Sequence, residues 1–228
     1  MTRPTTFELP TTDEMSGLLN ADYFRHLLRE QLVPQADESG EPLTAFLIDI
    51  DDLLPINQAH GREAGDRVIL EVVRVLREIA PGDALLTRYG GDEFGGALSE
   101  TRLDDAFTLL EEFRRRVTTL QFDGLPEVRI SCSVGLAACP GQGTTDVELM
   151  READQALYVA KTTGRNKVSL PLADSRMVTK TSHYTRVQLD RLAQLARRLN
   201  RNEASILREA LDDALKKHND RLSPPPPG

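Results

Sequence analysis

Cysteine is scarce in this sequence. Its 228 residues include two cysteines, Cys132 and Cys139, and no tryptophan. The spacing of the two cysteines matches neither a metal-binding pair nor a redox-active pair. A fold held together by disulfides or by cysteine-bound zinc is therefore excluded, and we expect two buried free thiols in a reducing cytoplasm.

Long apolar runs are also absent. No stretch approaches the roughly 20 apolar residues that a membrane-spanning helix needs. The first 14 residues are polar and contain no apolar core of a signal peptide. Hydrophobic residues make up 39% of the chain and charged residues 28%, as in an ordinary globular protein. We expect a cytoplasmic protein with no membrane partner.

Charge is divided unevenly along the chain. Residues 173–222 contain 11 Lys and Arg against 7 Asp and Glu, a net charge of +4. The remainder contains 17 basic and 29 acidic residues, a net charge of −12. This division predicts two domains with different partners. The last residues are proline-rich, and we expect residues 221–228 to form a disordered tail.

The most informative stretch is RYGGDEF, from Arg88 to Phe94. A β-prone run precedes it and a second apolar run follows it, which predicts a hairpin. Gly90 and Gly91 allow positive φ and let a ligand approach the backbone closely. Asp92 and Glu93 follow directly. Adjacent strand residues face opposite ways, so we expect one carboxylate to bind a metal while the other does something else.

The remaining pattern alternates strands with amphipathic helices. We expect helices that begin after the cap residue Asn20 and that span Arg62 to Ala80, Asp104 to Leu120 and Asp146 to Thr163. We expect strands from Leu43 to Ile50, which is buried, and from Val128 to Ala138. Residues 34–42 should form a loop, and a short segment contains Asn57. This order predicts an α/β fold, a mixed sheet flanked by helices.

Acidic residues cluster where the buried strand ends. Asp49, Asp51 and Asp52 would repel one another there, and a divalent cation with oxygen ligands would compensate their charge. Lys161 and Arg165 lie near the end of the last helix of this pattern. A phosphoryl-transfer site requires at least carboxylates that bind a metal and basic side chains that bind phosphates.

In order and spacing, these segments resemble the GGDEF family, the diguanylate cyclases, over about residues 13–170. The matching segments are DxxSGLxN from Asp13, DID from Asp49, Asn57, Gly65 with Asp66, RYGGDEF from Arg88, SVG from Ser133, and ADxALYxAKxxGRN from Ala153. The resemblance implies a GGDEF (nucleotidyl-cyclase-like) domain at residues 13–172, preceded by an N-terminal segment at 1–12.

The resemblance also implies a reaction, in which two GTP molecules are condensed to cyclic di-GMP with release of pyrophosphate. It assigns Mg²⁺, or Mn²⁺, to Asp49, Asp92 and the carbonyl of Ile50. It assigns GTP binding to Asn57 and Asp66 at the guanine edge, to Gly90 and Gly91 at the turn, and to Lys161 and Arg165 at the distal phosphates. Asp92, with Glu93 close by, would help to deprotonate the attacking 3′-hydroxyl.

The sequence departs from the family pattern at two places. Leu53-Leu54 stands where the family has Phe-Lys, which removes a basic nucleotide contact. Pro81 and Ala84 stand where the product-inhibited members have an Arg-x-x-Asp motif. We therefore expect this chain to lack the inhibitory site for cyclic di-GMP.

Residues 177–220 have a different pattern, with two amphipathic helices in a unit too small to bury both apolar faces. We therefore expect this module to form a homodimer. The stretches YTxxQLxxL from Tyr184 and SILREAL from Ser205 resemble the ribbon–helix–helix DNA-binding family. The resemblance implies operator DNA as a partner, with Thr179, Thr181 and His183 facing bases and the backbone near Asn202 facing a phosphate. The alternative is a helical hairpin that only dimerises.

Three functions are compatible with this organisation. The first is a diguanylate cyclase coupled to a DNA-binding dimerisation module. The second is a transcription regulator whose GGDEF domain senses GTP or cyclic di-GMP without catalysis. The third is a structural dimer scaffold, which explains none of the acidic and basic residues above. Residues 1–12 are too few to fold as a sensor, so we expect the C-terminal module to pair the catalytic domains.

Overall fold

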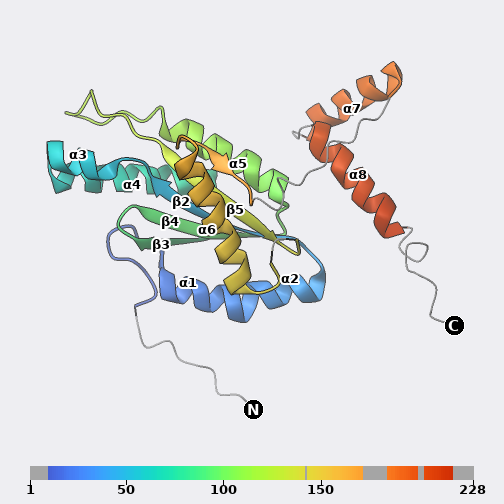
Figure 1. Ribbon diagram of the computed structural model, residues 1–228, viewed down its shortest axis with the longest axis horizontal. Helices are drawn as coiled ribbons and strands as arrows, with labels where there is room; N and C mark the ends of the chain where they lie inside the picture. Colours follow the sequence, from blue (N-terminus) through green and yellow to red (C-terminus); the bar gives the residue numbers. More distant parts are fainter. Residues whose placement is uncertain (1–9, 142, 172–183, 200–202, 218–228) are drawn as a thin grey trace, which may run out of the picture. The chain divides into compact units, whose positions relative to one another are not determined.

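The computed structural model describes residues 10–141, 143–171, 184–199 and 203–217 (Figure 1). The chain divides into two compact units, Met1–Met177 and Val178–Gly228, which are treated separately below. The expected tail at 221–228 and residues 1–9 of the expected N-terminal segment lie outside the described residues.

The first unit is built on a six-stranded mixed sheet with the strand order β1-β3-β4-β2-β5-β6. The strands are β1 (Leu19–Asn20), β2 (Leu43–Ile50), β3 (Leu85–Gly90), β4 (Glu93–Ser99), β5 (Cys132–Cys139) and β6 (Val168–Ser169). Central β2 is antiparallel to both β4 and β5, and β3 is antiparallel to β4. At the two edges, the short strand β1 is parallel to β3 and the short strand β6 is parallel to β5. The predicted mixed sheet and the predicted hairpin are confirmed.

Helices cover both faces of this sheet (Figure 1). One face carries α1 (Ala21–Leu27), the π-helical turn η1 (Leu28–Leu32), α2 (Val33–Ser39) and α6 (Asp146–Thr162). The other carries α4 (Arg62–Ile79) and α5 (Leu103–Val117), with α3 (Leu53–His60) packed beside α4. The architecture is therefore helices on both sides of one sheet.

Alternation along β2 assigns its side chains to the two faces. Phe46, Ile48 and Ile50 belong to the core formed with α4 and α5. Leu43 and Ala45 belong to the core formed with α1, α2 and α6. Because successive strand residues point to opposite faces, Asp49 is placed on the α6 side of the sheet.

Two short helices were not predicted. Residues 34–42 were expected to form a loop, but α2 spans Val33–Ser39 and ends at Gly40, whose φ is 72°. Pro34 is tolerated because it lies in the first turn, and the helix buries Val33 and Ala36. The expected short segment around Asn57 is α3, which begins after Asp52 and buries Leu53.

Both cysteines lie in β5, and both are buried free thiols, as predicted. Burial raises the pKa of the Cys132 thiol well above its usual value, and the nearby Asp51 and Asp49 raise it further. Among the described helices, none combines the length and apolarity needed to cross a membrane.

The second unit contains α7 (Arg186–Leu199) and α8 (Glu203–Lys217), which contact each other. Both predicted helices are confirmed. Ala196 and Ile206 are buried, whereas Val187, Leu195, Leu199 and Leu211 remain between 43% and 65% exposed. The expected DNA-contacting residues Thr179, Thr181, His183 and Asn202 lie outside the described residues.

Candidate active site

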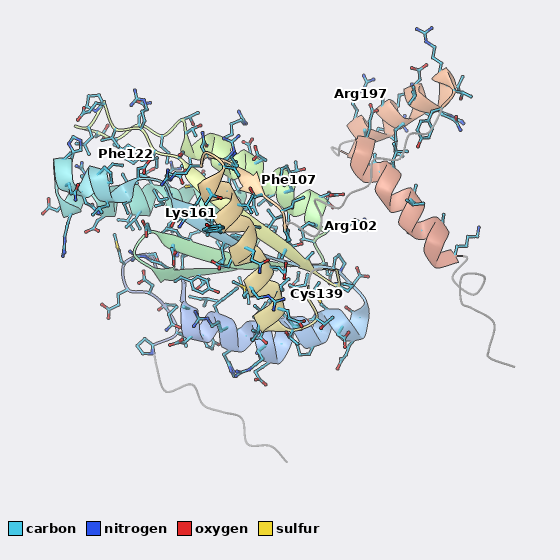
Figure 2. All side chains as sticks on the ribbon, in the orientation of Figure 1. Arg102, Phe107, Phe122, Cys139, Lys161 and Arg197 are labelled. Carbon is cyan, nitrogen blue, oxygen red and sulfur yellow. The ribbon has the colours of Figure 1, made fainter. Side chains whose placement is uncertain are left out.

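Asp49 forms an ion pair with Lys161 across the sheet–helix interface. The Asp49 Oδ2 atom lies 2.5 Å from Lys161 Nζ, and the Asp49 residue is 9% exposed. Lys161 lies in the last turn of α6, where Figure 2 labels it. The structure therefore joins two predicted site residues that are 112 positions apart in the chain.

Asp49 also lies close to the two acids of the hairpin. It is the direct cross-strand neighbour of Glu93 in the β2–β4 register. Burial raises the pKa of the Asp49 carboxyl group; Lys161 lowers it, and the charges of Asp92 and Glu93 raise it again. The net result is a pKa above the usual value, because burial, the largest cause, outweighs the contact with Lys161 and the two neighbouring acids add to it.

The hairpin turn places Asp92 and Glu93 on different sides. Gly90 and Gly91 have φ values of 146° and 53°, and a register shift separates Arg88 from Gly90 in the β3–β4 pairing. The Ile50 amide donates to the Asp92 carbonyl oxygen at 3.2 Å, which fixes the turn to the end of β2. The expectation that the two carboxylates face opposite ways agrees with the two hollows described next.

Asp92 lines a hollow of about 300 Å³ between the hairpin, α3 and α4, here called the α3–α4 hollow. Its lining residues are Leu53, Leu54, Asn57, Arg62, Asp66, Ile69, Arg88, Gly91 and Asp92. Four residues that were predicted to bind GTP or metal, Asn57, Asp66, Gly91 and Asp92, thus meet in one place. Arg62 was not assigned a role from the sequence, and Leu54 was noted there only as the loss of a basic nucleotide contact.

Asn57 lines the α3–α4 hollow and packs tightly against α4. A Cβ atom on Gly65 would lie 1.9 Å from Asn57 Oδ1, so a larger residue there would displace the Asn57 side chain. Among the described residues, Asn57 Oδ1 is buried without a hydrogen-bond donor. An unsatisfied buried acceptor costs free energy.

Glu93 lines a second hollow of about 420 Å³, on the other face of the sheet, here called the α1–α6 hollow. Arg25, Tyr89, Met150, Arg151 and Asp154 are among its other lining residues. Burial raises the pKa of Tyr89 to about 12, although Arg25 opposes the shift. The Arg25 guanidinium lies 5.2 Å from the centre of the Tyr89 ring.

Arg88 holds the carbonyl group of Gly91 in the hairpin turn. Its Nε and Nη2 atoms donate to the Gly91 carbonyl oxygen at 3.2 and 2.7 Å. Its Nη1 atom lies 3.1 Å from Asp13 Oδ1, so the N-terminal turn is joined to the hairpin. Arg88 was part of the matching motif, but the sequence alone did not give it this role.

The three acids at the end of β2 do not form one cation site. Asp51 is 4% exposed, and its two oxygens accept hydrogen bonds from the Ser131 and Ser133 hydroxyls and the Asn166 amide. Asp52 is exposed. The compensating cation expected at this cluster is therefore not needed by Asp51, because its charge is stabilised by hydrogen-bond donors; the assignment of a metal to Asp49 stays a prediction.

The site offers hard oxygen ligands of the kind that Mg²⁺ and Mn²⁺ bind. In the described part of the chain, however, no three acidic, histidine or cysteine side chains are close enough together to form a complete metal site. Asp49, facing Glu93 in register and near Asp92, fits a divalent cation by its ligand chemistry and its excess negative charge. Arg165 is exposed in the turn that follows α6.

Comparison with known proteins agrees with this arrangement. The family model described as "Diguanylate cyclase, GGDEF domain" matches residues 10–167. Response regulator PleD of Caulobacter vibrioides is 37% identical over 164 residues, covering 71% of this chain and 36% of PleD. Diguanylate cyclase A of Treponema denticola is 33% identical over 167 residues, covering 72% of this chain and 45% of that protein.

The fold is also similar to solved structures. The GGDEF domain of DgcB from Caulobacter crescentus, crystallised in complex with c-di-GMP, matches with a TM-score of 0.65 and 31% identity. The match covers 71% of this chain and 95% of that domain. The chain belongs to the GGDEF family of diguanylate cyclase domains. It spans less than half the length of the two curated relatives named above.

Proposed function

We propose that this protein is a diguanylate cyclase, which condenses two GTP molecules to cyclic di-GMP and releases pyrophosphate. The observation that carries the proposal is the position of the GGDEF hairpin. One turn brings Asp92 to the α3–α4 hollow with Asn57 and Asp66, and brings Glu93 into register with Asp49. A base-sized hollow and a set of carboxylates for a metal are thereby held side by side.

Each predicted site residue has a role that its chemistry allows. Asp66 accepts hydrogen bonds from the N–H groups of guanine, which favours guanine over adenine, and Asn57 binds the same edge. Gly90 and Gly91 let the phosphates approach the turn backbone. Lys161 and Arg165 bind the distal phosphates, where positive charge stabilises the departing pyrophosphate. Asp92, with Glu93 nearby, accepts the proton of the attacking 3′-hydroxyl.

We assign a divalent cation, Mg²⁺ or Mn²⁺, to Asp49, Asp92 and the carbonyl oxygen of Ile50. When bound, such a cation neutralises the negative charge that develops on the phosphate oxygens. Asp49 would exchange its contact with the Lys161 ammonium for the metal, which frees Lys161 for phosphate. The excess of carboxylates over cations in this site supports the assignment.

The test is synthesis by the purified full-length protein with GTP and Mg²⁺. We expect cyclic di-GMP and pyrophosphate as products. Asp92→Ala should reduce the rate at least 100-fold while the protein stays folded, because the turn adds little to the core. Asp83→Ala, which removes an exposed acid before β3, is the matched control. An Asp92→Ala variant as active as the wild type would contradict the assignment.

A second candidate is a regulator whose GGDEF domain senses GTP or cyclic di-GMP without catalysis. The replacement of the family's Phe-Lys by Leu53-Leu54 favours this reading, because it removes a basic contact from the α3–α4 hollow. The synthesis assay separates the two functions. A protein that binds GTP but forms no product would be a sensor.

For the C-terminal unit we propose a homodimerisation module that binds operator DNA as a ribbon–helix–helix domain. The support is its two consecutive helices, their exposed apolar residues and the net charge of +4 over residues 173–222. Electrophoretic mobility shift with genomic fragments tests it. Binding should weaken steeply as salt rises, because phosphate contacts release counterions. If the unit dimerises but binds no DNA, the alternative of a helical hairpin that only dimerises would be supported instead.

A further inference from the structure

The turn after α6 has an unusual backbone. Gly164, Arg165 and Asn166 have φ values of 114°, 55° and 46°. Non-glycine residues rarely adopt positive φ, and such turns persist where surrounding contacts hold them. The middle residue, Arg165, is one of the two cations that we assign to the phosphates of GTP. The contacts that hold this turn therefore determine where the Arg165 guanidinium lies.

Asp51 supplies one of these contacts. Its Oδ2 atom accepts a hydrogen bond from the Asn166 amide at 3.1 Å and another from the Ser131 hydroxyl at 2.6 Å. Its Oδ1 atom accepts from the Ser133 hydroxyl at 2.7 Å. The two serines fix the orientation of a carboxylate that is almost completely buried, so one oxygen is held toward the turn.

Other contacts join the turn to the helices. The Arg165 amide donates to the Ala160 carbonyl oxygen at 3.0 Å, at the end of α6. Arg114 on α5 donates to Asn166 Oδ1 at 2.9 Å. Asp51, in contrast, joins the turn to the end of β2, the strand that carries Asp49 two residues earlier. The Asp51 carboxylate thus links the strand that carries Asp49, the proposed metal ligand, with the turn that carries Arg165, the proposed phosphate-binding cation.

We propose that Asp51 is a positioning residue that acts through Arg165. It holds the 164–166 turn against β2, so that the guanidinium meets the distal phosphates of GTP when the nucleotide lies at Asp49. The proposal rests on the proposed function. Asp51 itself is 4% exposed and accepts hydrogen bonds from three donors, so it is engaged within the protein. Its loss should therefore weaken GTP binding more than it slows the chemical step.

The test compares two full-length variants that remove the same charge. In Asp51→Asn the side chain keeps one acceptor oxygen in place of two, so the link to the turn is weakened. We expect the KM for GTP to rise about tenfold with kcat within threefold of the wild type. Asp52→Asn, which changes the exposed neighbouring acid, should leave both near the wild-type values. An equal KM increase in both variants would mean a general charge effect and would overturn the proposal.

A double variant tests the route of action. If Asp51 acts through Arg165, then Asp51→Asn combined with Arg165→Ala should have the KM of Arg165→Ala alone, because coupled residues are not additive. A double variant in which the two KM increases multiply would show that Asp51 acts elsewhere. Asn166→Ala removes the Arg114 contact and strains the same turn without disturbing β2. It should raise KM in the same way, even if Asp51→Asn fails to fold.

Hydrogen exchange provides a readout that does not depend on catalysis. The Asn166 amide should exchange faster in Asp51→Asn than in the wild type, whereas it should be unchanged in Asp52→Asn. An unchanged Asn166 amide in Asp51→Asn would overturn the link between Asp51 and the turn. A wild type that forms no cyclic di-GMP would refute the proposed function instead, and the exchange rates would still decide whether Asp51 holds the turn.

Discussion

Leu54 occupies an unusual position for an apolar side chain. It lines the α3–α4 hollow together with Asp66 and Asp92, and it is 65% exposed. The GGDEF resemblance implies a lysine at this position. With leucine there, Arg62 and Arg88 are the basic residues that line this hollow. A lysine at position 54 would add a third positive charge to it.

We expect Leu54→Lys to lower the KM for GTP about fivefold. An exposed ion pair contributes at most about 1 kcal/mol, which corresponds to about fivefold in affinity. The measurement is the dependence of the initial rate on GTP concentration at low salt. Val147→Lys is the matched control, because Val147 is an exposed apolar residue in the first turn of α6. If both variants lower KM equally, the added charge acts non-specifically.

Asp13 offers a pH-dependent test at the same scale. Burial alone would raise the pKa of Asp13, but hydrogen bonds from Ser16 and the pairing with Arg88 lower it below 3.8 on balance. The unfolded state therefore binds this proton more readily than the folded state. The contribution of Asp13 to stability is present above pH 3.8 and is lost as the pH falls through the lowered value.

We expect Asp13→Asn to destabilise the protein at pH 6 and to make its stability less dependent on pH below 4. Urea unfolding midpoints between pH 6 and pH 3 measure this. Glu14→Gln removes the neighbouring exposed carboxylate and serves as the control. Parallel pH profiles for Asp13→Asn and the wild type would contradict the assigned ion pair.

At the scale of secondary-structure elements, α6 is held close to β5 by a glycine. A Cβ atom on Gly135 would lie 2.1 Å from the Leu157 amide nitrogen and 2.2 Å from the Ala153 carbonyl oxygen. Both neighbours are helix backbone and cannot rotate away. The helix that carries Lys161 therefore lies at a distance from the sheet that only glycine permits.

Gly135→Ala should destabilise the protein by about 3 kcal/mol, at the upper end of the range for overpacked cores. It should also reduce the rate of synthesis, because moving α6 moves Lys161 away from Asp49. Urea denaturation and the synthesis assay measure the two effects. Gly82→Ala is the control, since no atom lies within 4 Å of a Cβ at that position. A Gly135→Ala protein as stable as the control would refute the packing argument.

The elements that the sequence predicted best are those with a long apolar run or a clear helical period. The continuous apolar run from Leu43 to Ile50 was identified as β2 with its observed bounds. The bounds of α4 and α6 were also within one residue. The missed α2 and α3 are short, contain proline and begin without a side-chain cap hydrogen bond, so tertiary packing rather than local signal determines them.

The candidate site was predictable where residues match segments of the GGDEF family and not where they depend on packing. Asn57, Asp66 and Asp92 were assigned through that resemblance, and they do line one hollow. The roles of Arg88 and Asp51 depend on hydrogen bonds across 75 and 115 positions of the chain. Such contacts leave no periodic signal in a single sequence.

At the scale of the whole molecule, the proposed reaction needs two catalytic domains. Each domain has one α3–α4 hollow and would bring one GTP, so two must meet for bonds to form between the nucleotides. In the second unit, Val187 is 65% exposed, Leu199 51% and Leu211 59%. Apolar side chains left uncovered on a small helical unit favour association with a second copy. This unit is therefore the candidate dimerisation module.

We expect a variant truncated after Leu172 to keep the fold of the first unit, which has its own core, but to lose most activity at low protein concentration. Tethering raises the effective concentration of the second domain to about mM order. Specific activity across a dilution series of both proteins measures the effect. If the truncated protein matches the full-length protein at every dilution, the C-terminal unit does not pair the active sites.

The ion pair between Asp49 and Lys161 has a consequence for how the protein behaves before substrate arrives. Lys161 is a counter-ion that belongs to the chain itself. The protein therefore needs no ion from solution to compensate the buried charge of Asp49 when it folds. Under the proposed function, loading the site would be an exchange of one cation for another, in which the lysine moves from carboxylate to phosphate. The domain should accordingly remain folded in a chelator such as EDTA, with an unchanged thermal unfolding midpoint, while synthesis stops and returns when Mg²⁺ is restored.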